Sequence, residues 1–175
     1  MRMPAETSVW VLTNTTPLIA LAHVGLFPVL RALYGHLGLP PTVYREVVTE
    51  GRGRAGAQDT AEAVAMGWLE VLALRQPEAA QRLRAQFLLG DGESEVLALA
   101  QEHQVTLVLL DEDRAVRHAR ALGLPVLRTV GILLQAKTQH LLPDVKSPLD
   151  ALRTLGFRLS ERVYQQALQY AGEAP

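Results

Sequence analysis

Residues 105–126 read VTLVLLDEDRAVRHARALGLPV, and this stretch decides the fold. Its first six residues form an almost continuous aliphatic run without the apolar–polar alternation of a strand that has one solvent face. Such a run predicts a strand buried on both faces, at the centre of a parallel sheet. A charged helical segment follows at 111–123, and a second short aliphatic run follows at 124–128. A helix between two short strands is the order expected of a parallel sheet covered by helices.

The rest of the chain repeats this alternation of short strands and helices. Aliphatic runs predict further strands at 8–13, 36–39 and 68–72. Helical patterns occupy 42–50, 59–67, 77–87, 92–103, 129–140, 147–156 and 160–171. Thr16 and Pro17 are expected to open the first helix, because threonine caps free amides and proline suits the first helical position. The glycine-rich stretch 51–58 is expected to be a surface loop. The sequence therefore predicts an α/β fold.

Length and composition indicate one packed domain. The chain has 175 residues, of which 49% are hydrophobic and 20% charged, so we expect a single domain over 1–175 with a C-terminal helical segment from about 144. Cysteine is absent, which excludes disulfides, cysteine zinc sites and thiol nucleophiles. No stretch approaches the roughly 18 apolar residues of a membrane span, so we expect a soluble, cytoplasmic protein. The net charge of -1 requires any contact with nucleic acid to come from local patches.

Polar residues follow two of the predicted strands. Asn14 comes directly after the first strand, and Asp111, Glu112 and Asp113 follow the aliphatic run 105–110. Ligands of open α/β sheets gather beyond the carboxyl ends of the strands, so these side chains are candidates for a functional site. A helix cap explains them equally well, because asparagine and aspartate often precede helices and accept hydrogen bonds from the first free amides.

Glu93 lies on a helix face that is expected to be buried. Val96, Leu97 and Leu99 share one arc of the predicted helix. Glu93 falls inside that arc, whereas Glu95 points to the opposite side. A buried carboxylate is costly unless it is paired or bound to a metal ion, so Glu93 is a candidate ligand. The alternative is an N-terminal acid that complements the helix dipole.

Other charged residues give weaker signals. Glu46 and Glu50 both lie at the edge of the apolar stripe of the helix predicted at 42–50, and the pattern does not choose between them. Arg52 and Arg54, in the glycine-rich stretch, are candidates for phosphate contacts. For all four residues, a solvated surface is the commoner role.

Six segments of the chain carry a resemblance to a known family. They are VLTNTTPLIALA (11–22), LPPTVYREVV (39–48), LLGDGESEVLALA (88–100), LVLLDEDRAVRHARALGLPV (107–126), TVGILLQAKTQHLL (129–142) and LDALRTLGFRLSERVYQQAL (149–168). In their order and spacing these segments resemble a PIN domain, specifically the branch of small prokaryotic proteins related to VapC-type toxin ribonucleases. The resemblance covers nearly the whole chain.

The resemblance implies a three-layer α/β/α sandwich with a mainly parallel central sheet. It implies acids that bind Mg²⁺ or Mn²⁺, a choice of hard cation that suits oxygen ligands, and hydrolysis of single-stranded RNA. The positions that match the acids, with one further candidate ligand at the end, are Asn14, Glu46, Glu93, Asp111 and Asp113. The serine or threonine that follows the first acid corresponds to Thr15 or Thr16. A small antitoxin protein and a second copy of the chain are the protein partners that the resemblance implies.

Asn14 departs from the family pattern, because it stands where the first acid is expected. An amide oxygen can coordinate a cation but carries no charge, so the site loses one unit of attraction for the metal. This departure supports an alternative function, a catalytically weak PIN-like module that binds nucleic acid or regulates a partner. An unrelated nucleotide-binding fold is disfavoured, because the chain has no Walker loop.

Overall fold

The computed structural model of the protein describes residues 11–173. Within these residues the strands form one parallel sheet in the order β3-β2-β1-β4-β5. Their bounds are β1 Val11–Thr13, β2 Leu37–Leu39, β3 Leu69–Val71, β4 Leu107–Leu109 and β5 Val126–Leu127. Every strand therefore ends at the same edge of the sheet, which places the loops that follow the strands side by side.

Helices connect the strands and continue beyond the last one. Their bounds are α1 Thr15–His23, α2 Pro28–Tyr34, α3 Pro41–Tyr44, the π-helical turn η1 Arg45–Thr49, α4 Ala57–Ala65, α5 Pro77–Phe87, α6 Asp91–His103, α7 Asp113–Ala121, α8 Thr129–Thr138, α9 Lys146–Thr154 and α10 Glu161–Tyr170. None of these helices is both long and apolar enough to cross a membrane.

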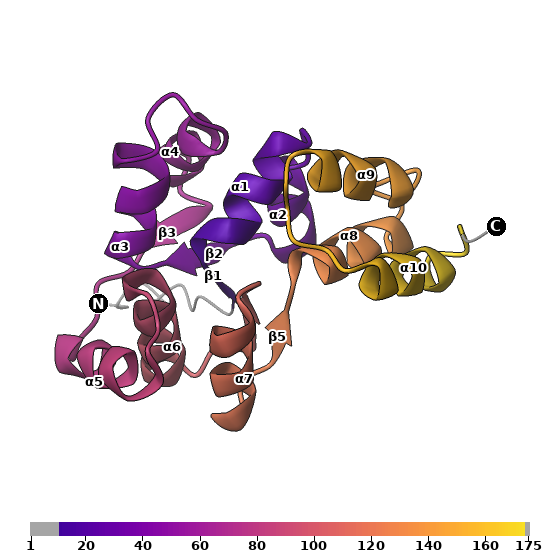
Figure 1. Cartoon of the computed structure of the whole chain (residues 1–175). Helices are drawn as coiled ribbons and strands as arrows, with labels where there is room; N and C mark the ends of the chain where they lie inside the picture. Colours follow the sequence, from indigo (N-terminus) through magenta and orange to yellow (C-terminus); the bar gives the residue numbers. More distant parts are fainter. Residues whose placement is uncertain (1–10, 174–175) are drawn as a thin grey trace, which may run out of the picture.

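The helices cover both faces of the sheet, which gives the expected three-layer α/β/α sandwich (Figure 1). On one face α6 packs against β1, with α5 and α7 beside it. On the other face α1 contacts α4 and α8, and α8 also contacts α2 and α10. The C-terminal helices α9 and α10 lie next to α8, away from α5 and α6 (Figure 1).

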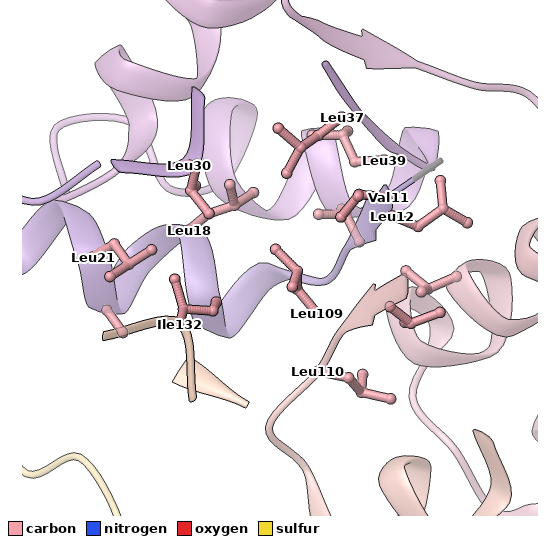
Figure 2. Close-up of a cluster of buried hydrophobic side chains, with 14 of the residues drawn as sticks. Val11, Leu12, Leu18, Leu21, Leu30, Leu37, Leu39, Leu109, Leu110 and Ile132 are labelled. Carbon is pink, nitrogen blue, oxygen red and sulfur yellow. The ribbon is translucent and has the colours of Figure 1, made fainter. Parts of the chain in front are cut away.

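The second half of the aliphatic run 105–110 is buried within the sheet, whereas Thr106 is exposed and Leu107 is partly buried. β4 lies between β1 and β5, although the middle position belongs to β1. Val108, Leu109 and Leu110 have no exposed surface, and each buried leucine side chain contributes about 2 kcal/mol of hydrophobic stabilisation. Figure 2 shows Leu109 and Leu110 in one cluster with Ile132 of α8 and leucines of the other strands.

Several local predictions were wrong. Thr16 does not cap the first helix, because α1 already begins at Thr15, with Asn14 in the N-cap position. The predicted loop 51–58 ends early, since α4 begins at Ala57. The helix predicted at 42–50 is divided into α3 and the π-helical turn η1, and α2 was not predicted as a separate helix. Residues 8–10 of the first predicted strand lie outside the described residues.

Candidate functional site

The candidate site lies beyond the carboxyl ends of β1 and β4. Thr13 pairs with Leu109 in the sheet, and the backbone amide of Asn14 donates to the Leu109 carbonyl at 3.0 Å. Asn14 therefore lies beside the end of β4, two residues before Asp111. The N-terminus of α6 reaches the same edge, because this helix runs back along the sheet before β4 begins.

Asn14 is buried but does not cap a helix with its side chain. It occupies the N-cap position of α1 with only 3% of its surface exposed, and its side chain accepts no hydrogen bond from the helix amides. The side-chain nitrogen Nδ2 donates instead to Oε1 of Glu93 at 3.3 Å. The side-chain oxygen Oδ1 is buried without a hydrogen-bond partner. A buried orphan acceptor costs about 1–3 kcal/mol, so this oxygen indicates a position where a ligand group is expected.

Glu46 and Gly92 converge on the same space. The hydroxyl of Thr15 donates to Oε2 of Glu46 at 2.6 Å. Thr15 directly follows Asn14 in the sequence, so this hydrogen bond holds the Glu46 carboxylate close to Asn14. A Cβ atom built on Gly92 would lie 3.1 Å from Oδ1 of Asn14 and 3.2 Å from Oε2 of Glu46. The missing side chain of Gly92 therefore leaves a space faced by two oxygen atoms, one from the N-cap residue of α1 and one from η1.

Glu93 and Glu95 face different partners although both lie near the start of α6. Glu93 is half-buried and contacts Asn14. Glu95 accepts hydrogen bonds from the backbone amide and the hydroxyl of Thr42, at 3.2 and 2.9 Å. Glu95 therefore caps α3, whereas the carboxylate of Glu93 lies beside the side-chain amide of Asn14.

The carboxylate of Asp111 is engaged by the start of α8. Its Oδ1 accepts from the backbone amide of Thr129 at 2.9 Å, and its Oδ2 accepts from the Thr129 hydroxyl at 2.6 Å. Burial raises the pKa of Asp111 above its ordinary range, and the hydrogen bonds from Thr129 and the charge of Arg128 partly oppose that rise. Asp111 does not cap α7, because Glu112 accepts from the amide of Ala115 and fills that role.

The remaining candidates lie further out. Asp113 has 81% of its side chain exposed and forms an ion pair with Arg128 at 2.8 Å. Arg52 and Arg54 are exposed in the turn before α4. Thr16 lies on the groove between α1 and α9, and its hydroxyl makes no hydrogen bond to Glu46, the role that Thr15 fills.

A comparison with protein families matches residues 10–173 to the family described as PIN domain. This match covers almost the whole chain. The protein belongs to the PIN-domain family. No curated protein matches it. Kinship with VapC-type toxins therefore stays an inference from the sequence segments.

Membership of the PIN-domain family points to a nuclease-type function and to binding of nucleic acid. PIN domains generally use divalent metal ions. Among residues 11–173, however, no three histidine or acidic side chains are grouped closely enough to hold a metal ion by themselves. Asn14 has a neutral side-chain oxygen that is buried without a hydrogen-bond partner and lies close to Glu46 and to the Cβ position of Gly92.

Sequence reasoning missed two residues of this PIN domain. Thr129 is the second residue after β5, as Asp111 is the second residue after β4. The rule that identified Asn14 and Asp111 at strand ends would therefore also have found Thr129. Gly92 stands directly before Glu93, and its place on the buried side of α6 was the available signal.

Asp111 is expected to stabilise the fold of this PIN domain through Thr129. Asp111→Ala should lower the free energy of unfolding by about 2 kcal/mol, because it leaves a buried hydroxyl and a helix amide without their acceptor. Asp113→Ala is the matched control, and it should stay within about 0.5 kcal/mol of the wild type because its side chain is exposed. Urea denaturation of both variants measures the difference. Equal losses of stability in the two variants would contradict the conclusion that Asp111 stabilises the start of α8.

Proposed function

We propose that the protein is a metal-dependent endoribonuclease that cuts single-stranded RNA. The single observation that carries this proposal is the orphan Oδ1 of Asn14, which faces the same space as the carboxylate of Glu46. The Asn14 oxygen has no hydrogen-bond partner, and Oε2 of Glu46 accepts only from the hydroxyl of Thr15. A cation in the space beside Gly92 would give the Asn14 oxygen a partner and would also lie close to Glu46.

The donor set at this position fits a hard divalent cation. The amide oxygen of Asn14 and the carboxylates of Glu46 and Glu93 are oxygen ligands, which Mg²⁺ and Mn²⁺ prefer. Asp111 is a further candidate ligand, and Asp113 is the outermost one. Two carboxylates with one amide are a small ligand set, in keeping with a cation that keeps several waters and also binds substrate phosphate.

A divalent cation supplies a Lewis acid that activates water and neutralises charge on the leaving oxygen of a phosphodiester. The chain's own residues fix the geometry around it. Thr15 orients Glu46 through its hydroxyl, and the amide of Asn14 orients Glu93. Thr15 and Asn14, which donate these hydrogen bonds, directly follow β1, and Glu93 lies at the start of α6. The two carboxylates are therefore already oriented and need little rearrangement to bind a cation.

A second function is favoured by the neutral charge of Asn14. An aspartate at this position would add one negative charge to the site, so the present side chains attract a cation less strongly. A PIN domain with weak metal affinity would bind RNA or regulate a partner without cutting at a useful rate. The two functions are separated by whether the protein cleaves RNA in millimolar Mn²⁺.

The proposal extends to the biological role. The resemblance to VapC-type toxins supports a toxin of a toxin–antitoxin pair, with a small antitoxin protein as partner and a homodimer as the assembled state. These three extensions rest on that resemblance alone.

Cleavage of RNA is expected to depend on Glu93 and not on Glu95. We would incubate the wild type, Glu93→Gln and Glu95→Gln with Mn²⁺ and a mixed pool of single-stranded RNA. Glu93→Gln should lose at least a hundredfold in cleavage rate, because it removes a charged ligand. Glu95→Gln changes the same kind of residue two positions away, and should keep the rate within about threefold.

Gel analysis of the products over time measures these rates. Cleavage by the wild type that survives in Glu93→Gln would contradict the proposed site. Absence of cleavage by the wild type in saturating Mn²⁺ would favour the second function.

A further inference from the structure

A groove of about 680 Å³ opens beside the candidate site. One wall is the turn that carries Asp111 and Asp113, and the opposite wall is the segment 157–160 that links α9 and α10. Figure 1 shows this linker returning past the N-terminal end of α8. The volume of the groove lies within the range of ~300–1,000 Å³ that is typical of pockets for small organic ligands. The groove therefore has room for a nucleotide-sized group and not for a double helix.

The two walls of the groove carry different arginines. Arg128 is occupied, because it forms an ion pair with Asp113 and donates to the backbone carbonyl of Asp111 at 2.9 Å. Arg158 is exposed and makes no hydrogen bond or ion pair with any of residues 11–173. An arginine without a carboxylate partner, at the wall of a groove that ends at acidic residues, is suited to a phosphate group.

The floor of the groove is apolar. Val130 at the start of α8 and Leu159 of the linker are half-buried, and Val163 of α10 is 41% exposed. Aliphatic side chains that remain accessible next to a free guanidinium fit a ligand that is flat and apolar at one end and anionic at the other. A nucleotide of a single strand has this character, because its unpaired base offers an apolar face next to a phosphate.

The backbone that carries Arg158 is held between α9 and α10 by contacts of the residues on either side of it. Arg153 of α9 forms an ion pair with Glu161 of α10 at 2.7 Å, and its guanidinium lies 4.4 Å from the centre of the Tyr164 ring. The side chain of Ser160 accepts a hydrogen bond from the amide of Val163 and caps α10. These contacts hold the linker, so the groove does not depend on a loop that must order itself when a ligand binds.

We propose that this groove, which we call the Arg158 groove, binds the nucleotide next to the phosphate that is cut, with Arg158 on its phosphate and the apolar floor under its base. The proposal rests on the proposed function for the choice of ligand. It adds a role for the α9–α10 hairpin as the wall that holds single-stranded substrate. Arg158 is then a positioning residue, distinct from the carboxylates that would hold the cation.

The test is binding of a fluorescent 12-nucleotide single-stranded RNA pool in EDTA, followed by anisotropy at several salt concentrations. Arg158→Gln should weaken binding about tenfold at low salt. It should also reduce the slope of log affinity against log salt by about 0.7, the value for one phosphate contact on a single strand. Arg162→Gln is the matched control, because Arg162 is also an exposed arginine, four residues away, and does not line the groove. It should stay within twofold of the wild type.

A second pair of variants tests the floor. Val163→Glu places a carboxylate in the groove and should weaken RNA binding at least tenfold, whereas Leu155→Glu places the same charge on an exposed leucine outside the groove. Equal weakening by Arg158→Gln and Arg162→Gln, or no weakening by Val163→Glu, would overturn the proposal. A wild type that does not bind the RNA pool would also overturn it.

Failure of the groove and failure of the proposed function remain distinguishable. The binding assay contains no metal, so it reports on the Arg158 groove alone. Calorimetric titration of Mn²⁺ into Arg158→Gln reports on the cation site and should match the wild type within twofold. A loss of Mn²⁺ affinity in Arg158→Gln would contradict its role as a residue that positions RNA only.

Discussion

Asn14→Asp is expected to raise the affinity for Mn²⁺ at least tenfold, equivalent to about 1.4 kcal/mol of binding free energy. The new side chain has nearly the same volume and places a charged oxygen where the orphan Oδ1 now lies. The added negative charge would lie within a short distance of the cation in a partly buried site, where attraction between charges is stronger than in water. One added charge is therefore sufficient for an effect of this size. Cleavage of single-stranded RNA should increase with metal affinity.

The same substitution should destabilise the metal-free protein by about 1–3 kcal/mol. The Asn14 amide now donates to Glu93 at 3.3 Å, and aspartate would replace this hydrogen bond by repulsion between two carboxylates. Thermal melts with and without Mn²⁺ and calorimetric titration separate the two effects. Gln81→Glu adds the same charge to an exposed position of α5 and should change neither quantity. If Asn14→Asp changes neither the metal affinity nor the stability of the metal-free protein, the assignment of Asn14 to the cation site is wrong.

Gly92→Ala is expected to lower the affinity for Mn²⁺ by about a hundredfold, equivalent to about 2.8 kcal/mol. The added methyl group would lie 3.1 Å from Oδ1 of Asn14 and 3.2 Å from Oε2 of Glu46. It therefore fills the space in which a cation would meet these two oxygens. The metal-free fold should stay within about 1 kcal/mol of the wild type, because the tight contacts oppose the gain of replacing glycine by alanine in a helix.

Ser94→Ala is the matched control for this variant. Ser94 is buried on the same turn of α6, and its hydroxyl donates only to the backbone carbonyl of Asp91. Calorimetric titration should give Ser94→Ala an affinity for Mn²⁺ close to that of the wild type. Mn²⁺ binding by Gly92→Ala at wild-type strength would show that the space beside Gly92 is not the metal site.

The sequence predicted the architecture well because that architecture follows from local patterns. Val108, Leu109 and Leu110, at the end of the aliphatic run, are buried inside the sheet. The alternation of strands and helices yields a parallel sheet with helices on both faces. Helix boundaries were predicted less well. The turn η1 packs against α1 and α4, and the separate helix α2 packs against α8. The spacing of apolar residues in the sequence does not reveal these contacts between elements.

The direction of a candidate side chain was predictable where a single element determines it. The helical wheel separated Glu93 from Glu95, and the two residues do bind different partners, Asn14 and Thr42. Asp111 was identified by its position after a strand. The residue that engages its carboxylate, Thr129, is eighteen positions away and comes close only through the pairing of β4 with β5. Such contacts across strands are fixed by the tertiary fold and not by sequence spacing.

The central claim, that Asn14, Glu46 and Glu93 form a cation site, is tested most directly by calorimetric titration of Mn²⁺ into the wild type, Glu93→Gln and Glu95→Gln. The account predicts one ion bound per chain in the wild type and in Glu95→Gln. It predicts a loss of at least tenfold in affinity in Glu93→Gln, whose carboxylate contacts the buried amide. Equal binding by all three proteins, or no binding by the wild type, would contradict the account.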